Sequence, residues 1–215
     1  MQKLLVIICL TTIYLSCKQK KEQVIVEQEI LVAQKIANAH GFENWKQVSE
    51  IQFTFFGKRN WTWKPKTNNV TLITETDTIN YNRKTLDSIS QNADKNFVND
   101  KFWLLIPFQL VWDANTTISE PIKTEAPISK TQINKITLTY PNEGGYTPGD
   151  AYDIFYNDDY IIKEWTFRRG NQPEATLVNT FENYQNFNGI KIALDHKKEA
   201  DDWNLSFSNV KVTLE

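Results

Sequence analysis

Apolar and polar side chains follow a helical spacing near the start of the chain, over residues 26–40, with Ile30 and Ala33 among the apolar positions of one face. Recurrence at three- and four-residue intervals predicts an amphipathic helix. Gly41 follows where glycine commonly ends a helix, because it readily adopts the left-handed conformation required there. A further short helical turn is expected over residues 43–48.

From residue 51 onward the pattern changes to alternation with a period of two, which is typical of antiparallel strands with one apolar face. Turn-forming Gly, Asn, Asp and Pro residues separate the alternating runs. The strands are expected over residues 51–55, 61–64, 70–74, 77–81, 133–140, 151–156, 160–167, 176–184, 190–196 and 203–214.

The centre of the chain interrupts this alternation. Residues 83–99 are polar with apolar positions at helical spacing, and residues 102–108 form the most apolar run outside the N-terminus. Pro107 disfavours the helical conformation at the residue before it, so a helix here is expected to stop near Leu105. Residues 112–130 are expected to be a long connection.

About ten strands with an N-terminal helix and one or two central helices predict an α+β fold, mostly antiparallel β, in a single domain over residues 25–215. The strands are rich in Phe and Trp, and two helices cover such an apolar sheet only in part. We therefore expect one sheet curled into a barrel or half-barrel, with the helices on its concave face. A sandwich of two sheet layers is the alternative. The curled arrangement leaves an apolar hollow.

The N-terminus carries a separate signal. Residues 4–15 are apolar after a short basic start, and Ser16 and Cys17 follow. This order is typical of a bacterial lipoprotein signal peptide, so residues 1–16 are expected to be removed, Cys17 to be acylated and residues 17–24 to form a tether. The apolar run of about 12 residues is short for a transmembrane helix, which needs roughly 20. A plain secretory signal is the competing interpretation.

Composition narrows the functional classes. Cleavage would leave 23 basic and 26 acidic residues, and this near-neutral balance gives no electrostatic case for binding nucleic acid. Cys9 would leave with the signal peptide, so the mature chain would have no thiol for a disulfide, a metal site or a nucleophile. Aromatic residues make up 13% of the chain, including 7 Trp, and supply large apolar surfaces for a core or a binding site.

Catalytic and metal-binding candidates are few. The two histidines, His40 and His196, have no further ligands at metal-binding spacing. Asp195 precedes His196 on an expected strand, where neighbours point to opposite faces, so the two do not predict a dyad. The acidic run over residues 150–159 lacks the spacing of an EF-hand loop and is better explained as a hairpin turn. We therefore expect no metal, no cofactor and no catalytic residue.

The aromatic strand residues are the remaining candidates for a binding site. Each of them alone is typical of core packing, but together they could line an apolar pocket beneath partly covering helices. Stacking platforms for sugars are the alternative use. The candidate pocket residues are Phe53, Phe55, Trp61, Trp63 and Trp103.

Several segments also carry a family resemblance. They are the His40-Gly41 pair with Trp45, the Phe-Gly-Lys-Arg segment over 56–59, and the segments over 99–108 and 148–153. Together with Cys17 they resemble uncharacterised lipoproteins of Bacteroidota over most of the mature chain, a resemblance that implies no activity. The helix-plus-meander layout is more distantly similar to the half-barrel lipoprotein carriers and receptors (LolA/LolB-like proteins). That similarity implies an apolar hollow, capped by helices, that holds acyl chains.

The sequence thus favours a non-enzymatic lipoprotein that is anchored in the cell envelope through Cys17 and binds a lipid or another apolar ligand. A surface or periplasmic module that binds glycans or proteins through exposed aromatics is the alternative, and an enzyme is the third hypothesis. Lys18 follows the cysteine in place of the aspartate that retains enteric lipoproteins in the inner membrane. This favours the outer membrane.

Overall fold

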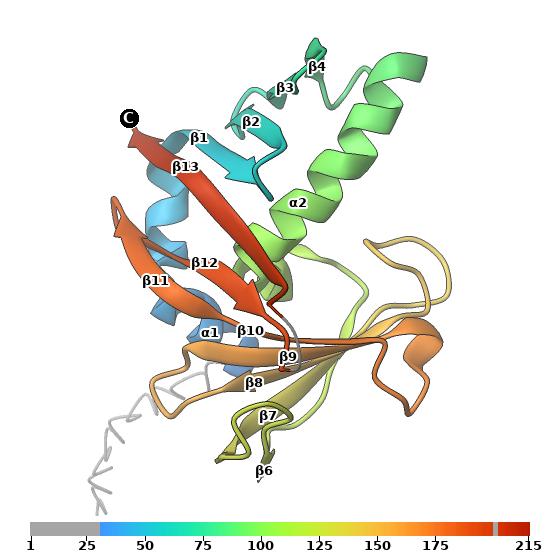
Figure 1. Ribbon diagram of the computed structural model, residues 1–215, viewed down its shortest axis with the longest axis vertical. Helices are drawn as coiled ribbons and strands as arrows, with labels where there is room; N and C mark the ends of the chain where they lie inside the picture. The colour runs from blue at the N-terminus through green and yellow to red at the C-terminus, as the bar shows by residue number, and fades with distance from the viewer. Residues whose placement is uncertain (1–30, 200–201) are drawn as a thin grey trace, which may run out of the picture.

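The computed structural model describes residues 31–199 and 202–215, which form two antiparallel sheets with helices beside and between them (Figure 1). The predicted α+β, mostly antiparallel class is confirmed. The predicted signal peptide 1–16, Cys17 and the tether over 17–24 lie outside the described residues. So do residues 26–30 of the predicted N-terminal helix.

The first sheet combines the N-terminal strands with the C-terminal ones. The four strands predicted between residues 51 and 81 form a meander, and β13 pairs with β1 to join the C-terminal strands to it. The strands are β1 (Val48–Phe55), β2 (Arg59–Lys64), β3 (Asn69–Ile73), β4 (Thr78–Asn82), β11 (Glu182–Phe187), β12 (Ile190–Lys197) and β13 (Asn204–Leu214). Their order in the sheet is β11-β12-β13-β1-β2-β3-β4.

The second sheet is built from the middle of the chain. Its order is β10-β9-β8-β7-β5, and β6 also pairs with β7. Two of these strands, β5 and β6, lie in the segment 112–130 that was expected to be a long connection. The strands are β5 (Thr117–Ile118), β6 (Ile122–Glu125), β7 (Gln132–Thr139), β8 (Ala151–Tyr156), β9 (Ile162–Arg168) and β10 (Leu177–Thr180). The short helix η2 (Arg169–Asn171) follows β9.

The prediction of a single curled sheet of about ten strands is wrong. The described residues form thirteen strands in two sheets, neither of which is closed or strongly curled. The expected strand over 176–184 is in fact β10 and β11, which belong to different sheets and flank the buried Phe181. Alternation describes the faces of a strand but not its partner, so the pattern could not reveal this change of sheet.

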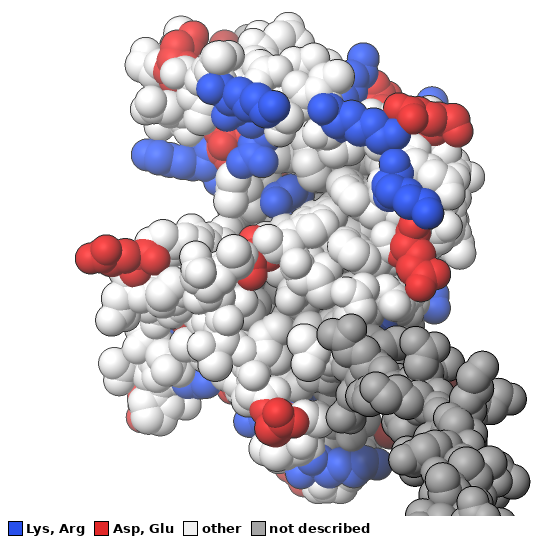
Figure 2. Space-filling model, turned by 180° about the vertical axis from the view of Figure 1, so that it is seen from behind, with Lys and Arg blue, Asp and Glu red and all other residues white. Residues whose placement is uncertain are grey.

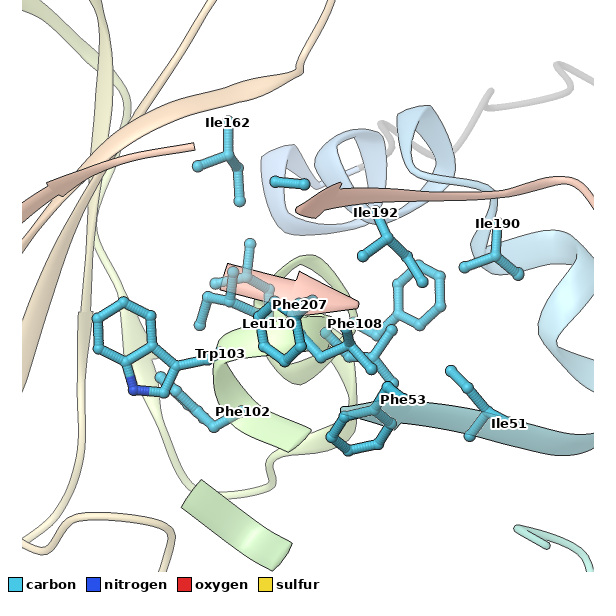
Figure 3. Packing of buried hydrophobic residues seen from close by; sticks show 14 of the residues in the cluster. Ile51, Phe53, Phe102, Trp103, Phe108, Leu110, Ile162, Ile190, Ile192 and Phe207 are labelled. Atoms are coloured by element: carbon cyan, nitrogen blue, oxygen red, sulfur yellow. The ribbon is translucent and has the colours of Figure 1, made fainter. Parts of the chain in front are cut away.

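The long helix α2 (Ser88–Trp112) explains why neither sheet needs to close. It runs from the edge of the first sheet into the space between the two sheets (Figure 1). Its residues 102–110 are buried on all sides. Phe102 and Trp103 pack against Tyr152 and Trp165 of the second sheet. The same core cluster includes Phe53 and Phe207 of the first sheet (Figure 3). One helix therefore covers the inner faces of both sheets.

The helix bends where a stop was predicted. Leu105 has φ −126° and ψ 30°, outside the helical region, and the chain then continues as helix to Trp112. Pro107 has no backbone N–H to bond back to Trp103. It is tolerated because it lies in the first turn after the bend, where N–H groups have no partner within the helix. The prediction thus located the break correctly but was wrong about where the helix ends.

The first helix, α1 (Val32–Ala39), and the 3-10 helix η1 (Phe42–Gln47) confirm the predicted N-terminal helical region. They are joined through Gly41, whose φ of 89° is the left-handed value expected after a helix. The Lys191 N–H donates to the His40 carbonyl, and the Asn44 amide donates to the Gly189 carbonyl. The helix end is thereby fixed against the turn between β11 and β12.

Candidate functional site

The five aromatic residues predicted to line a pocket all lie in the packed core. Phe53 and Phe55 on β1 pack edge-on against Phe207 of β13. Trp103 on α2 packs against Trp165 and His196, with ring centroids 4.5 and 5.5 Å away. None of these five side chains lines either of the two hollows described below. The five candidates are each at least nine-tenths buried: Phe53, Phe55, Trp61, Trp63 and Trp103.

Trp61 is held by a buried charge. Its Nε1–H donates to the Asp100 carboxylate at 2.8 Å, and Arg59 donates two hydrogen bonds to the same carboxylate, at 2.7 and 2.8 Å. Asp100 is fully buried, so the guanidinium and the indole together replace the water that it lost. This arrangement fixes the middle of α2 on the first sheet and is structural.

Both histidines are fully buried and serve the fold. The Nδ1–H of His40 donates to the Ile36 carbonyl at 2.8 Å, and that of His196 donates to the Thr180 carbonyl at 3.2 Å. Burial lowers the pKa of each to about 4, so both are neutral at physiological pH. Asp195 instead bonds Asn183 and Asn204, as expected for a strand neighbour on the opposite face.

The acidic run over 150–159 is distributed among separate structural contacts. Asp153 pairs with Arg168 at 3.0 Å, and Asp158 accepts a hydrogen bond from Asn134 at 2.9 Å. Asp150 accepts from the backbone N–H of Gly170. Across residues 31–199 and 202–215, no three His, Cys, Asp or Glu side chains converge as metal ligands.

A groove of about 890 Å³ lies where α1 and the end of α2 meet the second sheet. Ligand pockets commonly have volumes of roughly 300–1,000 Å³. Leu31, which is 76% exposed at the N-cap of α1, stands at its edge. Its apolar lining consists of Leu31, Val32, Ala33, Leu110, Val111, Ile118, Pro121, Tyr156 and Tyr160.

Tyr160 contributes a backbone conformation that is unusual for its type. Its φ is 61°, in the left-handed region, which costs a bulky residue on the order of 1–2 kcal/mol. The ring stacks on Tyr156 at 5.9 Å, and the Lys35 ammonium lies 5.8 Å from the Tyr160 ring centroid. These contacts offset the cost and hold two aromatic rings together in the wall of the groove.

Two carboxylates of the groove already accept hydrogen bonds from the protein. Asp113 accepts hydrogen bonds from Gln109 and from the Tyr140 hydroxyl. The hydrogen bond from Asn134 lowers the pKa of Asp158, which keeps its carboxylate ionised at the rim. The surface that remains for a ligand is therefore the apolar wall, with charges at its margin.

A second hollow of about 600 Å³ lies beside β10 and β11, between residues 129–133 and 180–184. It is smaller and involves no helix. Of the two hollows, the groove next to α1 is the larger and the better enclosed.

Elsewhere on the surface, Figure 2 shows Lys and Arg side chains mixed with acidic ones over the half that carries β1–β4 and the start of α2.

Comparison with known proteins adds no family, since no family model, curated protein or solved structure matches this chain. No helix within the described residues is long and apolar enough to cross a membrane.

Sequence reasoning missed the residues that form the groove. They come from α1, the end of α2, β5 and the turn after β8, and no local pattern links these segments. Leu31 was expected inside the helix over 26–40 and Tyr160 in the strand over 160–167, so neither residue indicated a groove. The aromatic strand residues predicted to line a hollow are packed in the core, and the groove lies instead at the margin of α1 and α2.

Proposed function

We propose that this protein is a lipid-anchored protein of the cell envelope that binds an apolar or amphiphilic ligand, of which a lipid is the expected class. The observation that carries the proposal is the groove of about 890 Å³ between two helices and a sheet, with an apolar wall and with Asp113 and Asp158 already hydrogen-bonded within the protein. We infer a binding role and not catalysis, because both histidines and the acidic run over 150–159 make structural contacts.

The position of the groove supports this proposal. Leu31 is 14 residues from Cys17, and a chain of that length spans at most about 50 Å. Acylation of Cys17 would therefore keep the groove within about that distance of a bilayer, and Lys18 favours the outer membrane. Each buried CH₂ of an acyl chain contributes about 0.8 kcal/mol, so several chains make a stable anchor.

The test uses the full chain with Cys17→Ser, purified without its acyl group, and titrates a fluorescent fatty acid. Leu31→Asp places a charge at the edge of the groove, while aspartate at an N-cap stabilises a helix, so the fold should persist. We expect at least a tenfold loss of affinity. Ile89→Asp is the matched control, because Ile89 is also exposed at a helix start but lies outside the groove. Equal binding by both variants, or none by the parent protein, would reject the proposal.

A second candidate function rests on a separate surface. Phe56, which is 39% exposed, lies in the turn between β1 and β2, with its ring centroid 6.2 Å from that of Trp203. Lys198 lies 4.7 Å from the Trp203 ring. Two neighbouring rings with a cation favour a module that binds glycans or proteins. A glycan-array signal lost in Phe56→Ala, with fatty-acid binding unchanged, would support this function over the groove.

A further inference from the structure

Aromatic rings from three elements pack together outside the groove, and two of them lie next to one lysine. Trp45 of η1 lies 5.4 Å from Trp63 of β2 and 4.9 Å from Trp112 of α2, between ring centroids. The Lys101 ammonium lies 5.9 Å from the Trp63 ring and 5.5 Å from the Trp112 ring. We call this group the indole–lysine cluster; its members are Lys101, Trp45, Trp63 and Trp112.

Lys101 is unusual in having so few polar partners. Its Nζ donates one hydrogen bond, to the Gln109 side-chain oxygen at 2.9 Å. In the described parts of the chain, no carboxylate oxygen lies within the 4.0 Å of an ion pair with this ammonium. An ammonium has three donors, so most of its hydrogen-bonding capacity is unused. The two indole faces supply only a weaker electrostatic attraction.

Trp63, whose ring centroid lies 5.9 Å from the Lys101 ammonium, adds a second donor to the cluster. Its Nε1–H is buried and has no hydrogen-bond partner, although the residue is 93% buried. Trp61, two residues earlier on the same face of β2, donates its Nε1–H to Asp100. A buried N–H without an acceptor costs on the order of 1–3 kcal/mol. A ligand that supplied an acceptor to this N–H would remove that cost.

We propose that the indole–lysine cluster is a binding site for a carboxylate carried on an apolar body. The carboxylate accepts hydrogen bonds from Lys101 and from Trp63, and the apolar body lies against the indole rings. This chemistry fits because two of the three donors of the Lys101 ammonium and the Nε1–H of Trp63 meet no protein acceptor in the described residues. It also fits because the ammonium offsets the repulsion between an anion and the indole faces. Lys101, Trp45 and Trp112 are only partly buried, so the cluster is open to solvent at its rim.

The charges around Lys101 are consistent with this assignment. Burial, and then the positive charge of Arg83, lower the pKa of Lys101 to about 8, whereas Asp113 and Asp94 act in the opposite direction more weakly. An anion bound to the ammonium raises that pKa, and by linkage the ammonium form binds the anion more tightly. Affinity for a carboxylate should therefore fall as the pH rises above about 8.

The experiment compares octanoate with 1-octanol, which share an apolar chain and differ in the charged group. Binding to the full Cys17→Ser protein is followed by tryptophan fluorescence at pH 7. We expect octanoate to bind at least tenfold more tightly than octanol, and we expect Lys101→Met to abolish that preference. Trp63→Phe keeps a ring but loses the N–H, and should reduce the preference in part. Lys95→Met, an exposed lysine on the same helix, is the matched control.

A second measurement uses the Cys17→Ser protein without further substitution, so it does not depend on whether a variant folds. Acetic anhydride modifies amines, and peptide mapping reports its rate at each lysine. Octanoate should slow acetylation of Lys101 several-fold and leave Lys95 unchanged. Equal affinity for octanoate and octanol, or unchanged acetylation of Lys101, would overturn the proposal. Leu31→Asp should leave the octanoate preference intact, so failure of the groove proposal and failure of this one are distinguishable.

Discussion

The backbone of Gly41 passes so close to Gly189 that a Cβ atom at position 41 would lie 1.8 Å from the Gly189 carbonyl oxygen. No flexible side chain is available to move aside, because the contact is with backbone. The end of α1 and the turn between β11 and β12 therefore require glycine at position 41 for two reasons, its positive φ and the absence of a side chain.

Gly41→Ala should lower the free energy of unfolding by about 3 kcal/mol or more, since the clash adds to the strain of a positive φ. Gly57→Ala is the matched control: Gly57 also has a positive φ, but a Cβ there meets nothing within 4 Å. The control should cost only about 1–2 kcal/mol. Urea unfolding of both variants measures the difference, and equal losses would contradict the close approach.

The Asp100 carboxylate, which joins α2 to β2 of the first sheet, should be one of the side chains most sensitive to substitution. Asp100→Asn removes the charge that pairs with Arg59 and leaves a partly buried guanidinium without its partner. We expect a loss of about 3–5 kcal/mol in denaturant unfolding. Glu182→Gln breaks an exposed pair with Lys197 at 2.7 Å and should cost at most about 1 kcal/mol. Similar losses in the two variants would show that burial does not determine how much each ion pair contributes to the free energy of unfolding.

The buried histidines should make the fold sensitive to mild acid. Their folded pKa of about 4 lies below the ordinary 6.5, so the unfolded chain binds more protons between these values. Stability is therefore lost as the pH falls from about 6.5 toward 4. His196→Phe removes one such group, and the drop in unfolding free energy between pH 7 and 5 should shrink by about 2 kcal/mol. An unchanged drop would contradict a neutral His196.

The indole–lysine cluster shows which features local sequence patterns predict and which they do not. Trp63 was predicted from alternation to lie on an apolar strand face, and it does lie in the core. Lys101 lies between the polar helical pattern over 83–99 and the apolar run over 102–108, and neither pattern indicated a site there. Its enclosure depends on Trp45 and Trp112, which come from η1 and from beyond the bend of α2. No residue spacing within any of these segments predicts that Lys101, Trp45 and Trp112 lie in one cluster.

The sequence by itself determined the local elements and their faces. Period-two alternation placed most strands, helical spacing placed α1 and the start of α2, and Pro107 marked the bend, because these features depend on neighbouring residues. Only the tertiary structure decided that the strands divide between two sheets, that Phe181 marks the change from one to the other, and that residues 102–110 fill the space between them. Those outcomes, and both proposed sites, depend on which apolar faces bury one another, and that is set by packing between segments far apart in the chain.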